Sequence, residues 1–195
     1  MTGFAEDNAP YAAPMTKAEF LRWVQRQERR HEFVAGRAVM HPGSTHRHAL
    51  LATRFVVAFS NRLDGEQWSI ATAEFGVETG AGIRYPDVLI APADIEATAF
   101  STHRAVVIVE ILSPSSVGTD MTEKLAEYTS LPSLQAYIVA SQDEAIVWVW
   151  QRNAASGAFP AKPQEIAGRE AAVELTALGL SLPMAELYRG IKTGQ

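Results

Sequence analysis

The chain has 195 residues, of which 47% are hydrophobic and 20% charged, with a formal net charge of −5 and no cysteine. These proportions are typical of a globular protein in water, and the length suits one domain with a substantial core. The absence of cysteine excludes disulfide bonds, thiolate metal sites and a cysteine nucleophile.

The first 14 residues are rich in Ala, Pro and Asn, and they lack the basic start and apolar centre of a signal peptide. We therefore expect a disordered tail over residues 1–14 and a single domain over residues 15–195. No apolar run approaches the roughly 20 residues that are needed to span a bilayer. The prediction is a cytoplasmic protein with no membrane partner.

Charge is distributed unevenly along the chain. Residues 1–62 hold nine Lys and Arg against five Asp and Glu, whereas residues 63–195 hold eight against seventeen. A basic N-terminal part would suit a phosphate backbone that approaches an acidic, cation-binding centre. The alternative is that the arginines only cover solvated helix faces. Composition leaves both interpretations open.

The N-terminal third predicts a helix, a hairpin and a second helix. Thr16-Lys17-Ala18-Glu19 is a capping box, which predicts a helix from Lys17 to Arg29. His31 to Met40 has the pattern of a hairpin with Ala35-Gly36 at its turn. A helical period of apolar residues then predicts a helix from Thr45 to Leu63.

Strand-like runs dominate the rest of the chain. The most apolar, Ala105–Leu112, predicts the central buried strand. Short helices are expected at Asp120–Ser130 and Met184–Ile191, irregular structure over 151–172, and an edge segment over 174–180. The other expected strands cover residues 68–73, 75–78, 83–90, 136–140 and 145–150. This order predicts an α/β fold, with a mixed β-sheet flanked by helices after an N-terminal helix and hairpin.

Two carboxylates and a lysine form the most informative pattern. Asp87 and Glu110 each lie in an apolar, β-branched run, and Lys124 follows on the next expected helix. Burying a carboxylate in such a run is costly unless it is paired or binds a cation. Pro86 interrupts strand pairing just before Asp87, which would let that carboxylate point into a cleft. The pattern indicates a site for a divalent metal and a phosphate.

This pattern suits phosphodiester hydrolysis. The reaction needs a cation on the phosphoryl oxygen, an activated water, and stabilisation of the developing negative charge. Mg²⁺ prefers oxygen ligands and retains several waters, so that two carboxylates can suffice, and Mn²⁺ is the alternative cation. Asp87 and Glu110 would bind the metal, and the carbonyl of Ile111 could add a ligand. Lys124 would orient the water or neutralise the phosphate.

Each of these residues also has a purely structural interpretation. Asp87 could cap the backbone at a strand edge, and Glu110 could be a buried glutamate paired with an arginine. Lys124 could lie on a solvated helix face. In that case the chain would be an unrelated small-molecule-binding α/β domain whose acids are structural.

Three further residues are candidates for accessory roles. Glu32 could be an outer metal ligand, or it could form a surface salt bridge with Arg30 or Arg37. His48 could contact phosphate or act as a base, or it could serve as a helix cap or packing residue. Tyr128 lies one helical turn after the expected catalytic lysine and would pack or hydrogen-bond beside it.

Several segments together resemble the Uma2 family of restriction-endonuclease-like proteins, which have the PD-(D/E)XK nuclease fold. The matching segments are Tyr85-Pro86-Asp87-Val88, Val109-Glu110-Ile111-Leu112-Ser113-Pro114-Ser115, the spacing Asp120…Lys124…Tyr128, Leu134-Gln135-Ala136-Tyr137-Ile138-Val139, Glu32-Phe33-Val34-Ala35-Gly36-Arg37 and His48. The resemblance covers residues 15–190, nearly the whole chain.

The resemblance implies a mixed β-sheet core and Mg²⁺-dependent cleavage of DNA, with Asp87, Glu110 and Lys124 as catalytic residues. In the larger fold the lysine usually lies two residues after the second acid, where this chain has Leu112. Uma2-like sequences place the lysine on the following helix, where this chain has Lys124. The leading prediction is therefore a metal-dependent DNA endonuclease, expected as a homodimer because cutting both strands needs two sites. The alternative is a catalytically inactive module of the same fold that binds nucleic acid or a protein partner.

Overall fold

The computed structural model describes residues 14–40, 43–112 and 119–192. The expected disordered tail, residues 1–14, lies outside these ranges except for Pro14. Among the described residues, none of the helices combines the length and the apolar character that crossing a bilayer requires.

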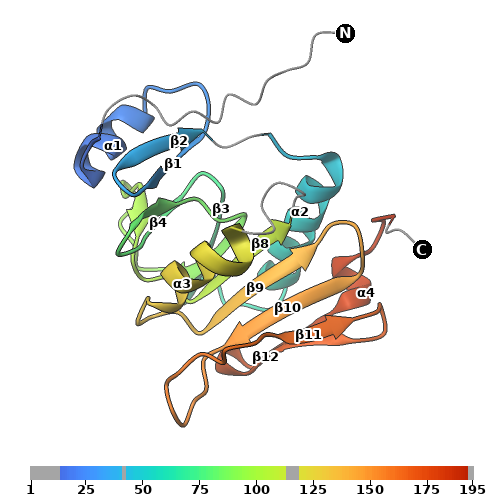
Figure 1. Ribbon diagram of the computed structural model, residues 1–195. Helices are drawn as coiled ribbons and strands as arrows, with labels where there is room; N and C mark the ends of the chain where they lie inside the picture. The colour runs from blue at the N-terminus through green and yellow to red at the C-terminus, as the bar shows by residue number, and fades with distance from the viewer. Residues whose placement is uncertain (1–13, 41–42, 113–118, 193–195) are drawn as a thin grey trace, which may run out of the picture.

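A six-stranded mixed sheet forms the centre of the molecule (Figure 1). Its strand order is β11-β10-β9-β8-β6-β3. The strands are β3 (Trp68–Thr72), β6 (Val88–Pro92), β8 (Val107–Leu112), β9 (Ala136–Ser141), β10 (Ile146–Gln151) and β11 (Gln164–Ala167). In the described chain, β8 and β9 run parallel and the other neighbours run antiparallel. All six residues of β8 are buried, so the expected mixed sheet with a central buried strand is confirmed.

A second sheet lies beside the first and has the strand order β2-β1-β5-β4-β7. Its strands are β1 (His31–Val34), β2 (Arg37–Met40), β4 (Gly76–Glu78), β5 (Gly82–Arg84) and β7 (Ser101–Thr102). The expected hairpin is confirmed, because β1 and β2 pair across Ala35 and Gly36, whose φ angles are 48° and 83°. Two positive φ angles match the twist of a two-residue hairpin turn.

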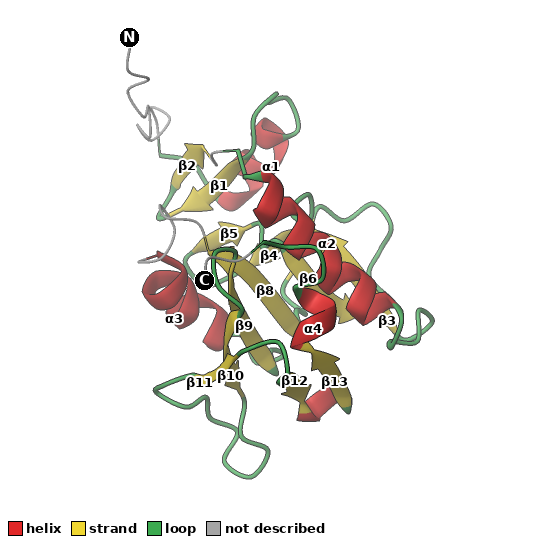
Figure 2. Ribbon diagram, turned by 90° about the vertical axis from the view of Figure 1, so that its right-hand side faces the viewer, coloured by secondary structure: helices red, strands yellow, loops and turns green. Residues whose placement is uncertain are grey.

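The helices are α1 (Lys17–Val24), α2 (His46–Ser60), α3 (Lys124–Thr129) and α4 (Met184–Leu187), and a π-helical turn, Thr119–Glu123, leads into α3. Helices α2 and α4 lie on one face of the central sheet and α3 lies on the other, whereas α1 packs on the second sheet (Figure 2). The capping box at Thr16 is present. Helix α1 ends five residues before the expected Arg29, because the side chains of Gln25 and Gln27 bond back to carbonyls of its last turn.

The expected strand over residues 83–90 is wrong as a single element. Residues 82–84 form β5 in the second sheet, whereas Val88–Pro92 forms β6 in the central sheet. Pro86 lies at the break, because proline has no N–H to donate to a ladder. The chain therefore passes from one sheet to the other at Tyr85-Pro86-Asp87, and Asp87 lies at the junction.

Two other expectations about the C-terminal part are corrected. The stretch 151–172, expected to be irregular, contains β11, which pairs with β10. The expected edge segment 174–180 is part of a hairpin of β12 (Ala172–Leu175) and β13 (Leu180–Pro183). Gly179 adopts a left-handed conformation between them, with φ of 62°, and reverses the chain.

Alternate residues of β8 serve two separate hydrophobic clusters. Val107, Val109 and Ile111 pack with α2 and α4, whereas Ile108 and Leu112 pack with Tyr128 of α3. Successive side chains of a strand point to opposite faces of the sheet. Glu110 has the parity of Ile108 and Leu112, and so its carboxylate faces α3.

Candidate active site

Glu110 is paired with two residues of α3. Its residue is 3% exposed, and its Oε1 accepts hydrogen bonds from Lys124 Nζ at 3.0 Å and from the Tyr128 hydroxyl at 2.9 Å. Lys124 and Tyr128 lie four residues apart on one helix face, which lets both reach the same oxygen. Lys124 is buried and does not lie on a solvated helix face. Glu110 is paired with this lysine and not with the arginine that the structural interpretation expected.

Asp87 directly precedes β6, and its carboxylate reaches the backbone of β8. The last pair in the antiparallel register of these two strands is Val88 with Val109. Asp87 Oδ2 accepts the N–H of Ile111 at 2.8 Å. The Asp87 side chain therefore accepts an N–H of β8 just beyond the point where the strand pairing ends.

His48, in the first turn of α2, contacts the Asp87 carboxylate. Its Nε2 lies 3.2 Å from Asp87 Oδ2, and the two side chains are 10% and 12% exposed. Thr45 caps α2 by accepting the N–H of His48, so the helix start fixes the position of this imidazole. His48 therefore lies in the capped first turn of α2, and it also contacts Asp87, a candidate metal ligand.

Glu32 is buried and forms ion pairs inside the site. It does not form the surface salt bridge that the sequence also allowed. Its Oε2 accepts from Arg84 Nη1 at 3.0 Å, and its Oε1 lies 3.8 Å from Lys124 Nζ. Arg84 also donates from Nε to Glu127 Oε2 at 3.0 Å and from Nη2 to Glu127 Oε1. The guanidinium therefore connects β1, β5 and α3 around the lysine.

The register of the second sheet brings Glu32 and Arg84 together. Phe33 pairs with Ile83 and Val34 with Gly82, so the next position sets Glu32 opposite Arg84. A Cβ on Gly82 would lie 1.9 Å from the carbonyl oxygen of Phe33, so only glycine allows this close approach. Burial lowers the pKa of the Arg84 guanidinium, but Glu127 and Glu32 outweigh it and raise that pKa above the ordinary value.

Sequence reasoning missed Arg84 and Glu127. Arg84 is 2% exposed, which is rare for arginine without buried partners. A signal was present in the sequence, because Arg84 follows apolar Ile83 shortly before Pro86. A charge at such a place is as unusual as the charge of Glu110. Glu127 gave no comparable signal, since a glutamate in a short helix is ordinary.

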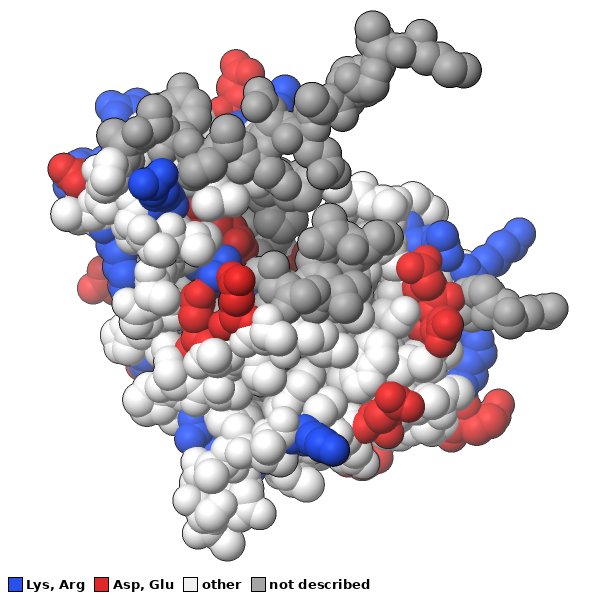
Figure 3. Space-filling view, in the orientation of Figure 1, with Lys and Arg blue, Asp and Glu red and all other residues white. Residues whose placement is uncertain are grey.

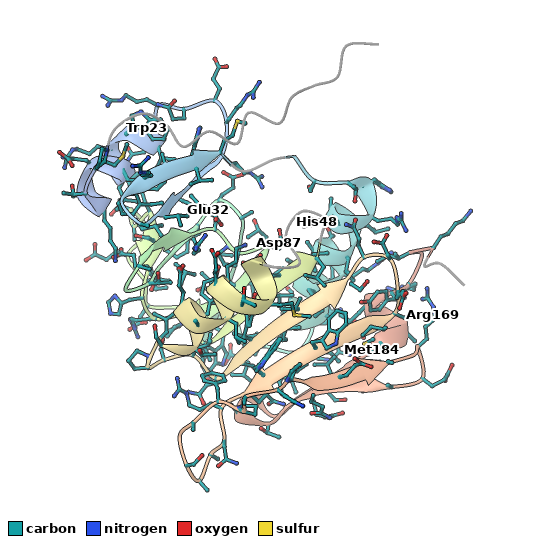
Figure 4. All side chains as sticks on the ribbon, viewed as in Figure 1. Trp23, Glu32, His48, Asp87, Arg169 and Met184 are labelled. Atoms are coloured by element: carbon teal, nitrogen blue, oxygen red, sulfur yellow. The ribbon has the colours of Figure 1, made fainter. Side chains whose placement is uncertain are left out.

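A cavity of about 470 Å³ opens at Asp87 and His48. Arg29, Arg30 and Met40 also line it, from the α1–β1 connection and the end of β2. In Figure 4, Glu32, Asp87 and His48 lie in one region between the β1–β2 hairpin and the start of α2. Figure 3 shows Lys and Arg side chains over α1 and this hairpin, with Asp and Glu among them.

The donor set suits a cation held by two carboxylates. Within residues 14–40, 43–112 and 119–192, no three His, Cys, Asp or Glu side chains are grouped closely enough to hold a metal. Mg²⁺ commonly takes one or two carboxylates and completes its shell with water and substrate phosphate. Asp87 and Glu110 are oxygen donors of this kind, and so they fit Mg²⁺ or Mn²⁺ better than Zn²⁺.

The family model of Uma2, described as "putative restriction endonuclease", matches residues 18–185. The chain belongs to the Uma2 family. The match spans the hairpin with Glu32, the Pro86-Asp87 junction, β8 and α3. The resemblance seen in the sequence motifs is thereby confirmed.

Two relatives and one solved structure are similar to this Uma2 protein over most of its length. The chain is 29% identical over 188 residues to the uncharacterized protein slr1290 of Synechocystis sp., covering 94% of this chain and 96% of that protein. It is 23% identical over 133 residues to sll1609 of the same organism, covering 66% and 75%. A crystal structure from Anabaena variabilis, described as "a putative nuclease belonging to DUF820", matches with a TM-score of 0.73 and 18% identity, covering 90% and 98%. This Uma2 protein therefore has the restriction-endonuclease-like fold.

Tyr128 predicts how stability depends on alkaline pH. Burial raises its pKa well above the ordinary value, and the charges of Glu110 and Glu32 raise it further. The folded protein keeps this proton where the unfolded chain loses it, so the stabilisation is complete below about pH 10 and is lost as pH rises. We expect Tyr128→Phe to flatten the fall in unfolding free energy above about pH 10, measured by urea titration.

Tyr188 provides a comparison, because burial also raises its pKa. Tyr188→Phe should flatten the same fall, and the double variant should flatten it more. Identical slopes in the wild type and Tyr128→Phe would contradict the assignment, whatever the change in stability at neutral pH.

Proposed function

We propose that this Uma2 protein is a metal-dependent DNA endonuclease that hydrolyses phosphodiester bonds at Asp87, Glu110 and Lys124. The observation that carries the proposal is the buried pair of Glu110 and Lys124, with the Asp87 carboxylate bonded to the backbone of Ile111 next to Glu110, beside a cavity lined by Arg29 and Arg30. Membership of a family described as restriction endonucleases supports it.

Asp87 and Glu110 would hold Mg²⁺ or Mn²⁺. The bound cation would polarise the phosphoryl oxygen and lower the pKa of a water molecule. His48 and the Ile111 N–H fix the Asp87 carboxylate, while Tyr128 fixes that of Glu110. Such contacts orient metal ligands and typically affect metal affinity by about 10- to 100-fold.

Lys124 would supply the positive charge that stabilises the phosphoryl transition state. The usual lysine position, two residues after the second acid, is Leu112, which lies on the same face of β8 as Glu110 and packs beside Tyr128. Lys124 reaches this face from α3, 3.0 Å from Glu110. A lysine from the helix above can therefore replace one from the strand.

Metal binding is the direct test. We expect calorimetric titration with Mn²⁺ to show a site that Asp87→Asn weakens by more than about tenfold. Asparagine can still accept the Ile111 N–H, which preserves the local fold. The matched control is Asp94→Asn, whose carboxylate is 71% exposed and pairs with Arg104 on the surface. Equal Mn²⁺ binding by wild type and Asp87→Asn would refute the metal site.

The second candidate is a catalytically inactive module of the same fold that binds nucleic acid or a protein partner. The observation in its favour is that Lys124 and Tyr128 both occupy Oε1 of Glu110 while Leu112 stands at the usual lysine position. DNA binding without Mn²⁺ binding or cleavage would favour it over the endonuclease.

We further propose that residues 15–195 form one domain and that the protein acts on DNA in the cytoplasm as a homodimer. The family match over residues 18–185 supports the single domain. A dimer would bring two sites to the two strands. Light scattering gives the mass in solution, and a monomer that only nicks plasmid DNA would count against the dimer.

A further inference from the structure

A second cavity of about 570 Å³ adjoins the candidate active site. Arg29 and Arg30 line both this cavity and the one at Asp87. Tyr85 lies in the second cavity, two residues before Asp87 in the first. Two extended residues span about 7 Å, so one short segment runs under the arginines from one cavity to the other. The second cavity is therefore a continuation of the proposed cleavage site.

An exposed aromatic ring marks the second cavity. Phe100 is 53% exposed, and with Val57 it is one of the two exposed large hydrophobic residues in the described chain. Phe100 lines the second cavity, whereas Val57 lines neither cavity. Aromatic side chains beside basic residues are typical of surfaces that bind unpaired nucleic acid, since each base offers a π-face for stacking.

The charges distinguish the two cavities. Glu28 and Glu74 line the second cavity, and Glu74 pairs with Arg30 at 2.6 Å. These carboxylates disfavour a phosphate there but tolerate an uncharged base. Burial, followed by the charges of Glu32 and Glu74, raises the pKa of Tyr85 to about 12, so its hydroxyl stays neutral. The cavity is thus suited to a neutral, flat and polar-edged group.

We propose that this cavity binds an unpaired base of the DNA strand being cut, stacked on Phe100, while Arg29 contacts the adjoining phosphate. The cavity volume lies within the range of about 300–1,000 Å³ that is usual for small-molecule sites, and so it can hold one nucleoside. The proposal deepens the proposed endonuclease function: the substrate is DNA with an unpaired stretch at the cleavage site.

Fluorescence anisotropy without divalent metal tests this proposal. The probes are a labelled single-stranded oligonucleotide, its fully paired duplex, and the duplex with one unpaired base. We expect wild type to prefer the two probes with unpaired bases, and Phe100→Ala to lose about tenfold in affinity for them and little for the duplex. Phe100→Trp should retain affinity. Val57→Ala is the matched control and should bind as wild type does.

Equal affinity of wild type and Phe100→Ala for the unpaired probes would overturn the proposal, as would a preference for the paired duplex or no DNA binding. A thermal melt confirms that Phe100→Ala remains folded. The two proposals fail separately. If wild type and Phe100→Ala cleave paired DNA equally well, only the unpaired-base proposal is refuted. If binding depends on Phe100 but no cleavage occurs with Mg²⁺ or Mn²⁺, only the endonuclease proposal is refuted.

Discussion

Replacing Glu110 by glutamine is expected to lower the rate of DNA cleavage by about a thousandfold, equivalent to about 4 kcal/mol of transition-state stabilisation. The change removes the charge of one of the two proposed metal ligands and leaves an amide of nearly the same shape. Its oxygen can still accept from the Tyr128 hydroxyl, 2.9 Å from Glu110 Oε1 in the wild type. The measurement is the single-turnover cleavage rate of supercoiled plasmid with saturating Mn²⁺.

Two controls separate catalysis from folding. Glu96→Gln changes an exposed carboxylate and should leave the cleavage rate unchanged. The unfolding free energy of Glu110→Gln should remain sufficient for a folded protein, because Glu32 still lies 3.8 Å from Lys124 Nζ and offsets its charge. A folded Glu110→Gln that cleaves as fast as wild type would exclude Glu110 from the reaction.

Much of the fold could be predicted because the signals are local. The capping box at Thr16, the hairpin turn at Ala35-Gly36 and the apolar run of β8 each depend on a few neighbouring residues. The division of 83–90 between two sheets was not predicted, since strand-like residues stand on both sides of Pro86 and no local signal tells that the chain changes sheets there. Strand β11 was missed for a related reason: three of its four residues are exposed.

The sequence nominates Asp87, Glu110 and Lys124 as site residues, but it indicates neither Arg84 and Glu127 nor the contacts among these side chains. Asp87 and Glu110 were identified because a carboxylate in an apolar strand is unusual. The pairing of Glu32 with Arg84 joins positions 52 residues apart and depends on the register of β1 against β5. Nothing local encodes that register except Gly82, whose role appears only once the Phe33 carbonyl is in place. The contact of Lys124 with Glu32 follows from the same pairing.

Arg84→Met is expected to lower the unfolding free energy by about 3–5 kcal/mol, a large part of the stability of a domain of this size. Methionine fills much of the arginine volume but leaves the carboxylates of Glu32 and Glu127 buried without their cation. Their side chains are 9% and 14% exposed, so water cannot replace it fully. Arg84→Lys should recover only part of the lost unfolding free energy, because an ammonium group cannot form the two paired hydrogen bonds to Glu127. Urea titration measures both losses.

Arg62 offers a matched control, because it also forms paired hydrogen bonds to one carboxylate, Glu186. That pair is about a quarter exposed, at 26% and 24%, so Arg62→Met should cost no more than about 1 kcal/mol. If Arg84→Met costs no more than Arg62→Met, the variant does not leave Glu32 and Glu127 as unpaired buried charges, and the stability prediction is wrong. The network would then serve to hold Lys124 beside Glu110, and its loss would appear in the cleavage rate and not in stability.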